Sequence, residues 1–139
     1  GGISVTSYNR KVLLTGQVGS DEDRRQAEQI VGRIDNVRSV ENALQVAGQP
    51  ALTASASDAA VSAGVKATLL EHSDTKATAV KVVTESGVVY LMGIASRKEA
   101  DRVAQVASRV RGVQKVVAVF EIVSEEELAR LLKSQSESR

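Results

Sequence analysis

The feature that most constrains the fold of this chain is that its sequence repeats itself once. The segment Lys11–Gly16 aligns with Val88–Gly93, and the residues that follow align at a spacing of 76. The matched pairs at this spacing are Ser20 with Ser96, Gln29 with Gln105, Arg33 with Arg109, Val37 with Val113 and Val40 with Val116. A repeat at domain spacing indicates that one small folding unit occurs twice within the 139 residues.

Each repeat has the pattern of a strand, a turn, a strand, a helix and a last strand. In the second repeat, Val80 and Val82 alternate with polar residues before the turn Glu85–Gly87, which is typical of a β-hairpin. The run Val88–Met92 is continuously apolar, as expected for a central strand. The sequence Ser-Arg-Lys-Glu from Ser96 is a capping box, and it predicts the start of a helix.

The predicted helix of each repeat is amphipathic. In the second repeat its inner face consists of Ala100, Val103, Ala104, Val106, Ala107 and Val110. Gly112 ends this helix, and Val113–Val123 follows as a strand parallel to the central one, because such crossovers are right-handed. In the first repeat the inner face consists of Ala27, Ile30, Val31 and Ile34. Asn36 replaces Gly112 there, and asparagine is also accepted at a left-handed helix end.

Only the second repeat has a further helix, Asp58–Glu71, before its first strand. The sequence therefore predicts an α/β fold, an α+β sandwich of two αββαβ domains. Each domain is a three-stranded mixed sheet with helices on one face, and the first lacks its leading helix. We place the first domain at 1–47, a linker at 48–56, the second domain at 57–123 and a C-terminal helix with a frayed tail at 124–139.

Composition argues against several classes of function. The net charge is only +1, and two Tyr, one Phe and no Trp leave little for stacking on bases. Gly16–Gly19 reads as G-x-x-G, but the acids from Asp21 onward repel phosphate, so we interpret it as a turn. With no Cys and His72 as the only histidine, no catalytic, metal or cofactor site is expected. No apolar run has the length of a membrane-spanning helix.

The pattern G-V-V-Y-L-M-G at Gly87–Gly93, with S-R-K-E-A from Ser96 and R-G-V-Q-K-V from Arg111, resembles the BON domain. Two such units with a short linker resemble the dual-BON outer-membrane lipoproteins of Gram-negative bacteria. The resemblance covers residues 3–123 and is incomplete for the first domain. It implies a non-enzymatic, lipid-anchored periplasmic protein that binds anionic phospholipid mainly through the leading helix of the second domain. Relatives often carry a large aromatic near the start of that helix, where this chain has Ala60.

The helix Asp58–Glu71 carries the candidate binding site. Val61, Val65, Thr68 and Leu69 form an inner stripe at helical spacing. The opposite face is also apolar and has one lysine at its flank; the candidate lipid- or partner-binding residues are Ala59, Ala60, Ala63, Lys66, Ala67 and Leu70. Two interpretations stay open. Either this face packs on the first domain or the tail helix, or it contacts lipid or a partner, with Lys66 near an anionic headgroup.

The C-terminal segment has a capping box of its own, Ser124–Glu127, followed by leucines at helical spacing: Leu128, Leu131 and Leu132. This pattern predicts a helix over residues 125–133, with 134–139 frayed. A helix of about nine residues is not stable alone in water. We therefore expect it to pack on a BON domain of its own chain or of a neighbouring molecule, and a loose extension is the alternative.

The function predicted from these features is that of a non-enzymatic envelope module. It would bind anionic phospholipid such as phosphatidylglycerol at the periplasmic face of the outer membrane and support membrane integrity. The alternative is a periplasmic protein–protein interaction module that uses the same helix face. An envelope protein partner is expected, as is self-association through the tail helix or the exposed first-domain sheet, but no nucleic acid. The predicted location is the periplasm, with an N-terminal lipid anchor upstream of Gly1.

Overall fold

The computed structural model describes residues 2–49, 56–72 and 79–137. Contacts between residues divide the chain into two compact units, Gly1–Ala51 and Leu52–Arg139. Each unit is built from one repeat of the sequence, with the additional helix and the C-terminal helix belonging to the second. The two units are described separately.

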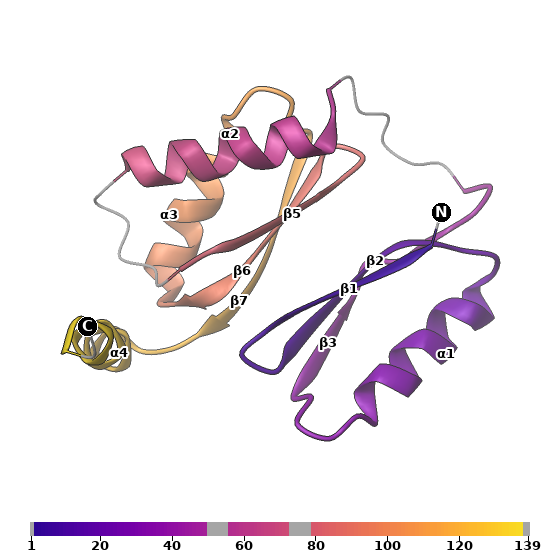
Figure 1. Ribbon diagram of the computed structural model, residues 1–139, viewed down its shortest axis with the longest axis horizontal. Coiled ribbons are helices and arrows are strands. Elements are labelled where there is room, and N and C mark those ends of the chain that lie inside the picture. Colours follow the sequence, from indigo (N-terminus) through magenta and orange to yellow (C-terminus); the bar gives the residue numbers. More distant parts are fainter. Residues whose placement is uncertain (1, 50–55, 73–78, 138–139) are drawn as a thin grey trace. The chain divides into compact units, whose positions relative to one another are not determined.

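The first unit consists of β1 (Ile3–Tyr8), β2 (Lys11–Val18), α1 (Asp21–Gly32), β3 (Ser39–Asn42) and β4 (Gln45–Val46). Strands β1 and β2 are antiparallel and are joined by Asn9 and Arg10, which both have positive φ. Strands β3 and β4 pair parallel to β2 in one continuous register, Lys11 opposite Ser39 and Gln17 opposite Gln45. They are therefore two pieces of one third strand, and α1 lies over one face of this sheet (Figure 1).

The second unit consists of α2 (Asp58–Glu71), β5 (Lys81–Glu85), β6 (Val88–Ala95), α3 (Arg97–Ser108), β7 (Lys115–Ile122) and α4 (Glu125–Glu137). Strand β6 is central, antiparallel to β5 and parallel to β7. The turn residues Ser86 and Gly87 both have positive φ, as the tightest hairpin turns require. Helices α2 and α3 cover the same face of the sheet (Figure 1). The predicted α/β fold of two BON-like units is thus confirmed.

The core of the second unit joins both helices to all three strands. Its buried residues are Val61, Val65, Val82, Val89, Leu91, Ala95, Ala100, Val103, Ala107 and Phe120. The corresponding cluster among the described residues of the first unit has three buried members: Val12, Leu14 and Leu44. The predicted leading helix therefore contributes directly to the larger core, and its absence from the described part of the first unit leaves a smaller one.

The prediction for the inner face of the first helix is wrong at two positions. Ile30 is 64% exposed and Ile34 is 55% exposed, whereas Ala27 and Val31 pack against the core as expected. The counterpart of Ile30 is Val106, which is 3% exposed. The reason is that α2 packs on α3 in the second unit, and no described residue of the first unit forms a helix in that place.

Two further local predictions need correction. Gly16 and the two residues after it lie inside β2 rather than in a turn. Glycine is needed there because a Cβ at Gly16, whose φ is +115°, would collide with the carbonyl oxygen of Gly2. The C-terminal helix α4 extends to Glu137 instead of ending at residue 133. Its predicted start is confirmed, since the Ser124 hydroxyl accepts the Glu127 N–H at 3.1 Å, and Leu128 is only 2% exposed.

Candidate functional site

Helix α2, which carries the candidate site, is fixed at its N-terminal end by two sets of hydrogen bonds. The hydroxyl of Ser57 accepts the backbone N–H of Ala60 at 3.1 Å and so caps the helix. The carboxylate of Asp58 accepts the N–H groups of Ser86 at 2.8 Å and Gly87 at 3.0 Å. The start of α2 is therefore tied to the hairpin turn between β5 and β6.

The inner side of α2 packs against the sheet and α3. Val61 and Val65 are buried in the core, at 2% and 0% exposure. The hydroxyl of Ser62 lies 2.7 Å from that of Thr84 in β5. A Cβ on Gly64 would lie 3.2 Å from a methyl of Val110, so glycine allows α2 to approach the turn that follows α3 closely. These contacts fix which face of α2 points outward.

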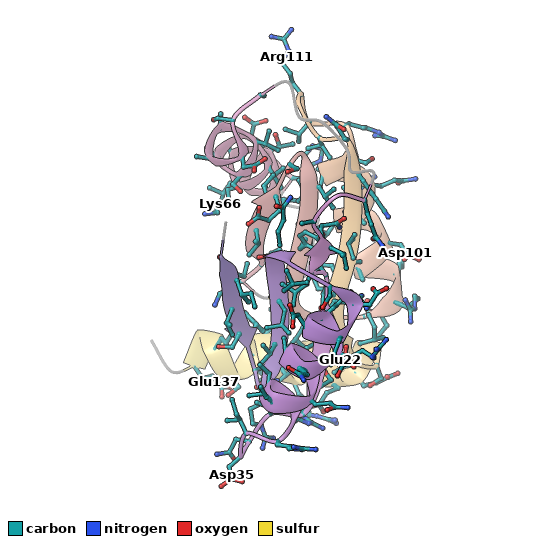
Figure 2. All side chains as sticks on the ribbon, turned by 90° about the vertical axis from the view of Figure 1, so that its right-hand side faces the viewer. Glu22, Asp35, Lys66, Asp101, Arg111 and Glu137 are labelled. Atoms are coloured by element: carbon teal, nitrogen blue, oxygen red, sulfur yellow. The ribbon has the colours of Figure 1, made fainter. Side chains whose placement is uncertain are left out.

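The outward face of α2 consists of the residues that the sequence singled out. All six side chains are exposed: Ala59, Ala60, Ala63, Lys66, Ala67 and Leu70. Leu70 is the most exposed large apolar side chain of the described residues, at 85%. Figure 2 shows Lys66 on α2, at the surface of the second unit. We call this set of six residues the outer face of α2. No described segment of the second unit, α4 included, covers it.

Chemically, the outer face offers methyl groups, one isobutyl group and one ammonium group. The two acids of α2, Asp58 and Glu71, stand at its ends, and Lys66 is the one basic residue within the helix. Within residues 2–49, 56–72 and 79–137 there is no group of three or more His, Asp or Glu side chains that could hold a metal ion. No helix of those ranges combines the length and apolar character needed to cross a bilayer.

The structure also brings together residues that sequence reasoning did not connect. Arg109 and Arg111, at the end of α3, line a groove with Gly64 and Thr68 of α2. These pairs are about 40 residues apart in the chain, so no local pattern joins them. One signal was present in the repeat: at a spacing of 76, Arg111 stands where the first repeat has Asp35.

Two α/β units in tandem, the second carrying an outward apolar helix, place this chain in a class of small repeated modules. A family model of the BON domain matches residues 1–48 and 57–124. The chain therefore belongs to the BON-domain family, and the resemblance seen in its glycine-flanked strands is confirmed.

Three relatives show how far this similarity extends. The chain is 36% identical over 121 residues to the 21 kDa hemolysin of Actinobacillus pleuropneumoniae, covering 87% of this chain and 62% of that protein. It is 33% identical over 120 residues to the outer membrane lipoprotein DolP of Haemophilus influenzae, covering 86% and 62%. It is 33% identical over 117 residues to the osmotically-inducible protein Y of Escherichia coli K12, covering 82% and 58%. The chain thus spans less than two thirds of the length of each of these relatives.

Proposed function

We propose that this protein is a non-enzymatic module of the bacterial envelope that binds anionic phospholipid through the outer face of α2. It acts at the periplasmic surface of the outer membrane, held there by a lipid anchor upstream of Gly1, and supports the integrity of that membrane. Phosphatidylglycerol is an example of such an anionic phospholipid. The observation that carries the proposal is an exposed apolar helix face with a lysine beside it.

An exposed apolar surface on an otherwise well-packed unit needs a reason. The inner side of α2 already contributes Val61 and Val65 to the core, so the outer face is not required for folding. A helix of this kind can lie at a membrane interface with its apolar side toward the acyl chains. Lys66 then reaches the headgroup layer, where a basic residue contributes about 1 kcal/mol of attraction to anionic lipid.

The relatives support the placement in the envelope. One of them is described as an outer membrane lipoprotein, and a location at the outer membrane is what the proposal requires. The charge of the second repeat is compatible with it, since residues 51–123 contain nine Lys or Arg and seven Asp or Glu. A weak positive balance favours an anionic surface without creating a general polyanion binder.

Vesicle sedimentation tests the proposal. The protein should sediment with vesicles containing phosphatidylglycerol, and less at high salt, because the electrostatic part of the attraction is screened. Vesicles of phosphatidylcholine alone should retain much less protein. Failure to bind either vesicle at low salt would exclude the lipid proposal. Capture of an envelope protein that depends on the same six residues would then favour the alternative, a protein–protein interaction module.

Two variants assign the contact to the outer face. Lys66→Glu should weaken binding to phosphatidylglycerol vesicles by about tenfold, because the attraction of one cation is replaced by repulsion. The matched control is Lys98→Glu, which makes the same change of charge at an exposed position in the first turn of α3. Leu70→Gln should also weaken vesicle binding, without lowering the melting temperature, since this side chain is 85% exposed.

A further inference from the structure

A groove runs between α2 and the end of α3 in the second unit. It has a volume of about 330 Å³, near the lower end for small-molecule sites. Its α2 wall is formed by Gly64, Thr68 and His72. Its other wall is formed by Val106 and Val110 with Arg109 and Arg111. The groove therefore combines two valines with two guanidinium groups, and none of its described lining residues is acidic.

Neither Arg109 nor Arg111 has a side-chain hydrogen bond or an ion pair with another described residue. Two other exposed arginines are paired, Arg25 with Glu22 at 2.7 Å and Arg130 with Glu127, whereas Arg33 in the first repeat has no side-chain partner among the described residues either. The hydrogen bond that Arg25 donates to Glu22 raises the pKa of Arg25, and the one that Arg130 donates to Glu127 raises the pKa of Arg130. Within the described residues nothing neutralises the two groove arginines, and guanidinium is well suited to phosphate oxygens.

The first repeat can be compared with the second at the positions of these two arginines. Arg33 and Arg109 occupy the same position, the residue that ends α1 and α3 respectively. Beside them, the first repeat has Asp35 where the second has Arg111. A single cation is therefore common to both helix ends, where it suits the negative end of the helix dipole. The second cation occurs only in the repeat in which α2 closes the groove.

The groove is adjacent to the outer face of α2. Gly64, Thr68 and His72 continue the row that begins at Ala60, because residues four apart follow each other along one side of a helix. In Figure 2, Lys66 projects from α2 and Arg111 from the segment before β7, in different directions. Because the groove shares the row of α2 that begins at Ala60, a ligand in it would lie next to one edge of the outer face.

We propose that this groove binds the phosphate headgroup of one anionic phospholipid molecule. Arg109 and Arg111 contact the phosphate, the half-buried Val110 contacts the glycerol and the first methylene groups, and the acyl chains remain outside. The volume suits a headgroup rather than a whole lipid. This inference deepens the proposed function and rests on it, so its test uses lipid monomers as well as vesicles.

The experiment titrates the full chain with dihexanoyl phosphatidylglycerol below its micelle concentration and follows backbone amides by NMR. Amides of Gly64, Thr68 and Arg111 should shift with a saturable dependence. The double variant Arg109→Gln/Arg111→Gln should weaken this binding at least tenfold. The matched control, Arg33→Gln, removes the helix-end cation of the first repeat and should leave the affinity for the lipid monomer unchanged. Dihexanoyl phosphatidylcholine should bind much more weakly, since its choline cation faces the arginines.

Three results would overturn the inference. The first is an absence of saturable shifts at the groove. The second is inorganic phosphate binding as tightly as the lipid, which would make the groove a site for free anions. The third is a double variant with a lower melting temperature and unchanged lipid affinity, which would limit the arginines to stabilising helix ends. If the protein still binds vesicles when one of these results is found, the proposed function stands and only the groove site is excluded. If it binds lipid monomers but not vesicles, the proposed function is excluded and the groove site stands.

Discussion

Val106 in the second repeat and Ile30 in the first occupy the same place in the repeated pattern, yet 3% of the former and 64% of the latter is exposed. The first strands show the same contrast: Val82 is 8% exposed and its counterpart Val5 is 62% exposed. In the second unit α2 packs on β5 and α3, whereas the described part of the first unit has no such helix. The comparison teaches that periodicity marks the side chains that can be buried, while a covering element decides whether they are.

The largest expected change in stability comes from a substitution that tests this comparison directly. Val106→Ala should lower the free energy of unfolding of the second unit by about 2–3 kcal/mol, because buried methyl groups are lost and a cavity is left. Ile30→Ala should change the stability of the first unit by about 0.5 kcal/mol or less, since its side chain is already largely in water. Amide hydrogen exchange, read separately for the two units, measures both. Equal losses would mean that the first face is covered in solution.

The next effect concerns the tie between α2 and the hairpin. Asp58→Ala removes the acceptor of two backbone N–H groups, at 2.8 and 3.0 Å. We expect a loss of about 2 kcal/mol from the second unit, because hydrogen bonds to a charged acceptor are among the stronger ones. The amides of Ser86 and Gly87 should exchange faster, while those of the first unit stay unchanged. The stability of Asp58→Asn should lie between that of the unchanged protein and that of Asp58→Ala, because the amide oxygen of asparagine is still an acceptor.

A smaller difference in stability is expected between substitutions in the turns that follow α1 and α3. Gly112 has φ +91°, and a Cβ there would lie 2.9 Å from a methyl of Val61 in α2. Gly112→Ala should therefore cost about 1–2 kcal/mol, from backbone strain and the contact with α2 together. Asn36 has a similar φ of 74°, and Asn36→Gly should stay within about 0.5 kcal/mol. Thermal unfolding of the two single variants tests the difference; a substantial loss for Asn36→Gly would count against it.

The smallest effect is one in which the repeats should agree. Ser20 and Ser96 cap α1 and α3 by accepting the N–H of Asp23 at 3.1 Å and of Glu99 at 3.2 Å. Replacing either serine by alanine should cost about 1 kcal/mol. Denaturant unfolding monitored in each unit should give two losses that agree within about 0.5 kcal/mol. A much larger loss at Ser96, which is 2% exposed, would show that burial strengthens its cap.

Much of the fold could be predicted because its signals are local. The hairpin at Ser86 and Gly87 and the caps at Ser96 and Ser124 each depend on residues within a few positions of one another. The helix Asp58–Glu71 was predicted with the bounds that the structure has, since Val61, Val65 and Leu69 follow one another at single-turn intervals. The six residues of the outer face follow from the same periodicity.

The remainder depends on contacts between distant segments. The exposure of Ile30 could not be read from its helix, because the absent covering element is not part of that helix. Arg109 and Arg111 line a groove only because α2 packs beside the end of α3. The extension of α4 to Glu137 escaped prediction because its last turn is polar and has no apolar period to follow. A helix can continue through such residues on intrinsic propensity and weak side-chain pairs, as between Lys133 and Glu137 at 4.0 Å.

The four alanines in the outer face of α2 have a kinetic consequence for any surface that meets them. An alanine side chain has no rotamers to lose, so forming the contact carries no side-chain ordering cost at these positions. Each methyl group also buries little area, so the contact gains little free energy per residue. Affinity differences between related contacts lie mostly in the dissociation rate. Such a face therefore favours a short residence time on its target, with repeated release and rebinding while the protein stays nearby.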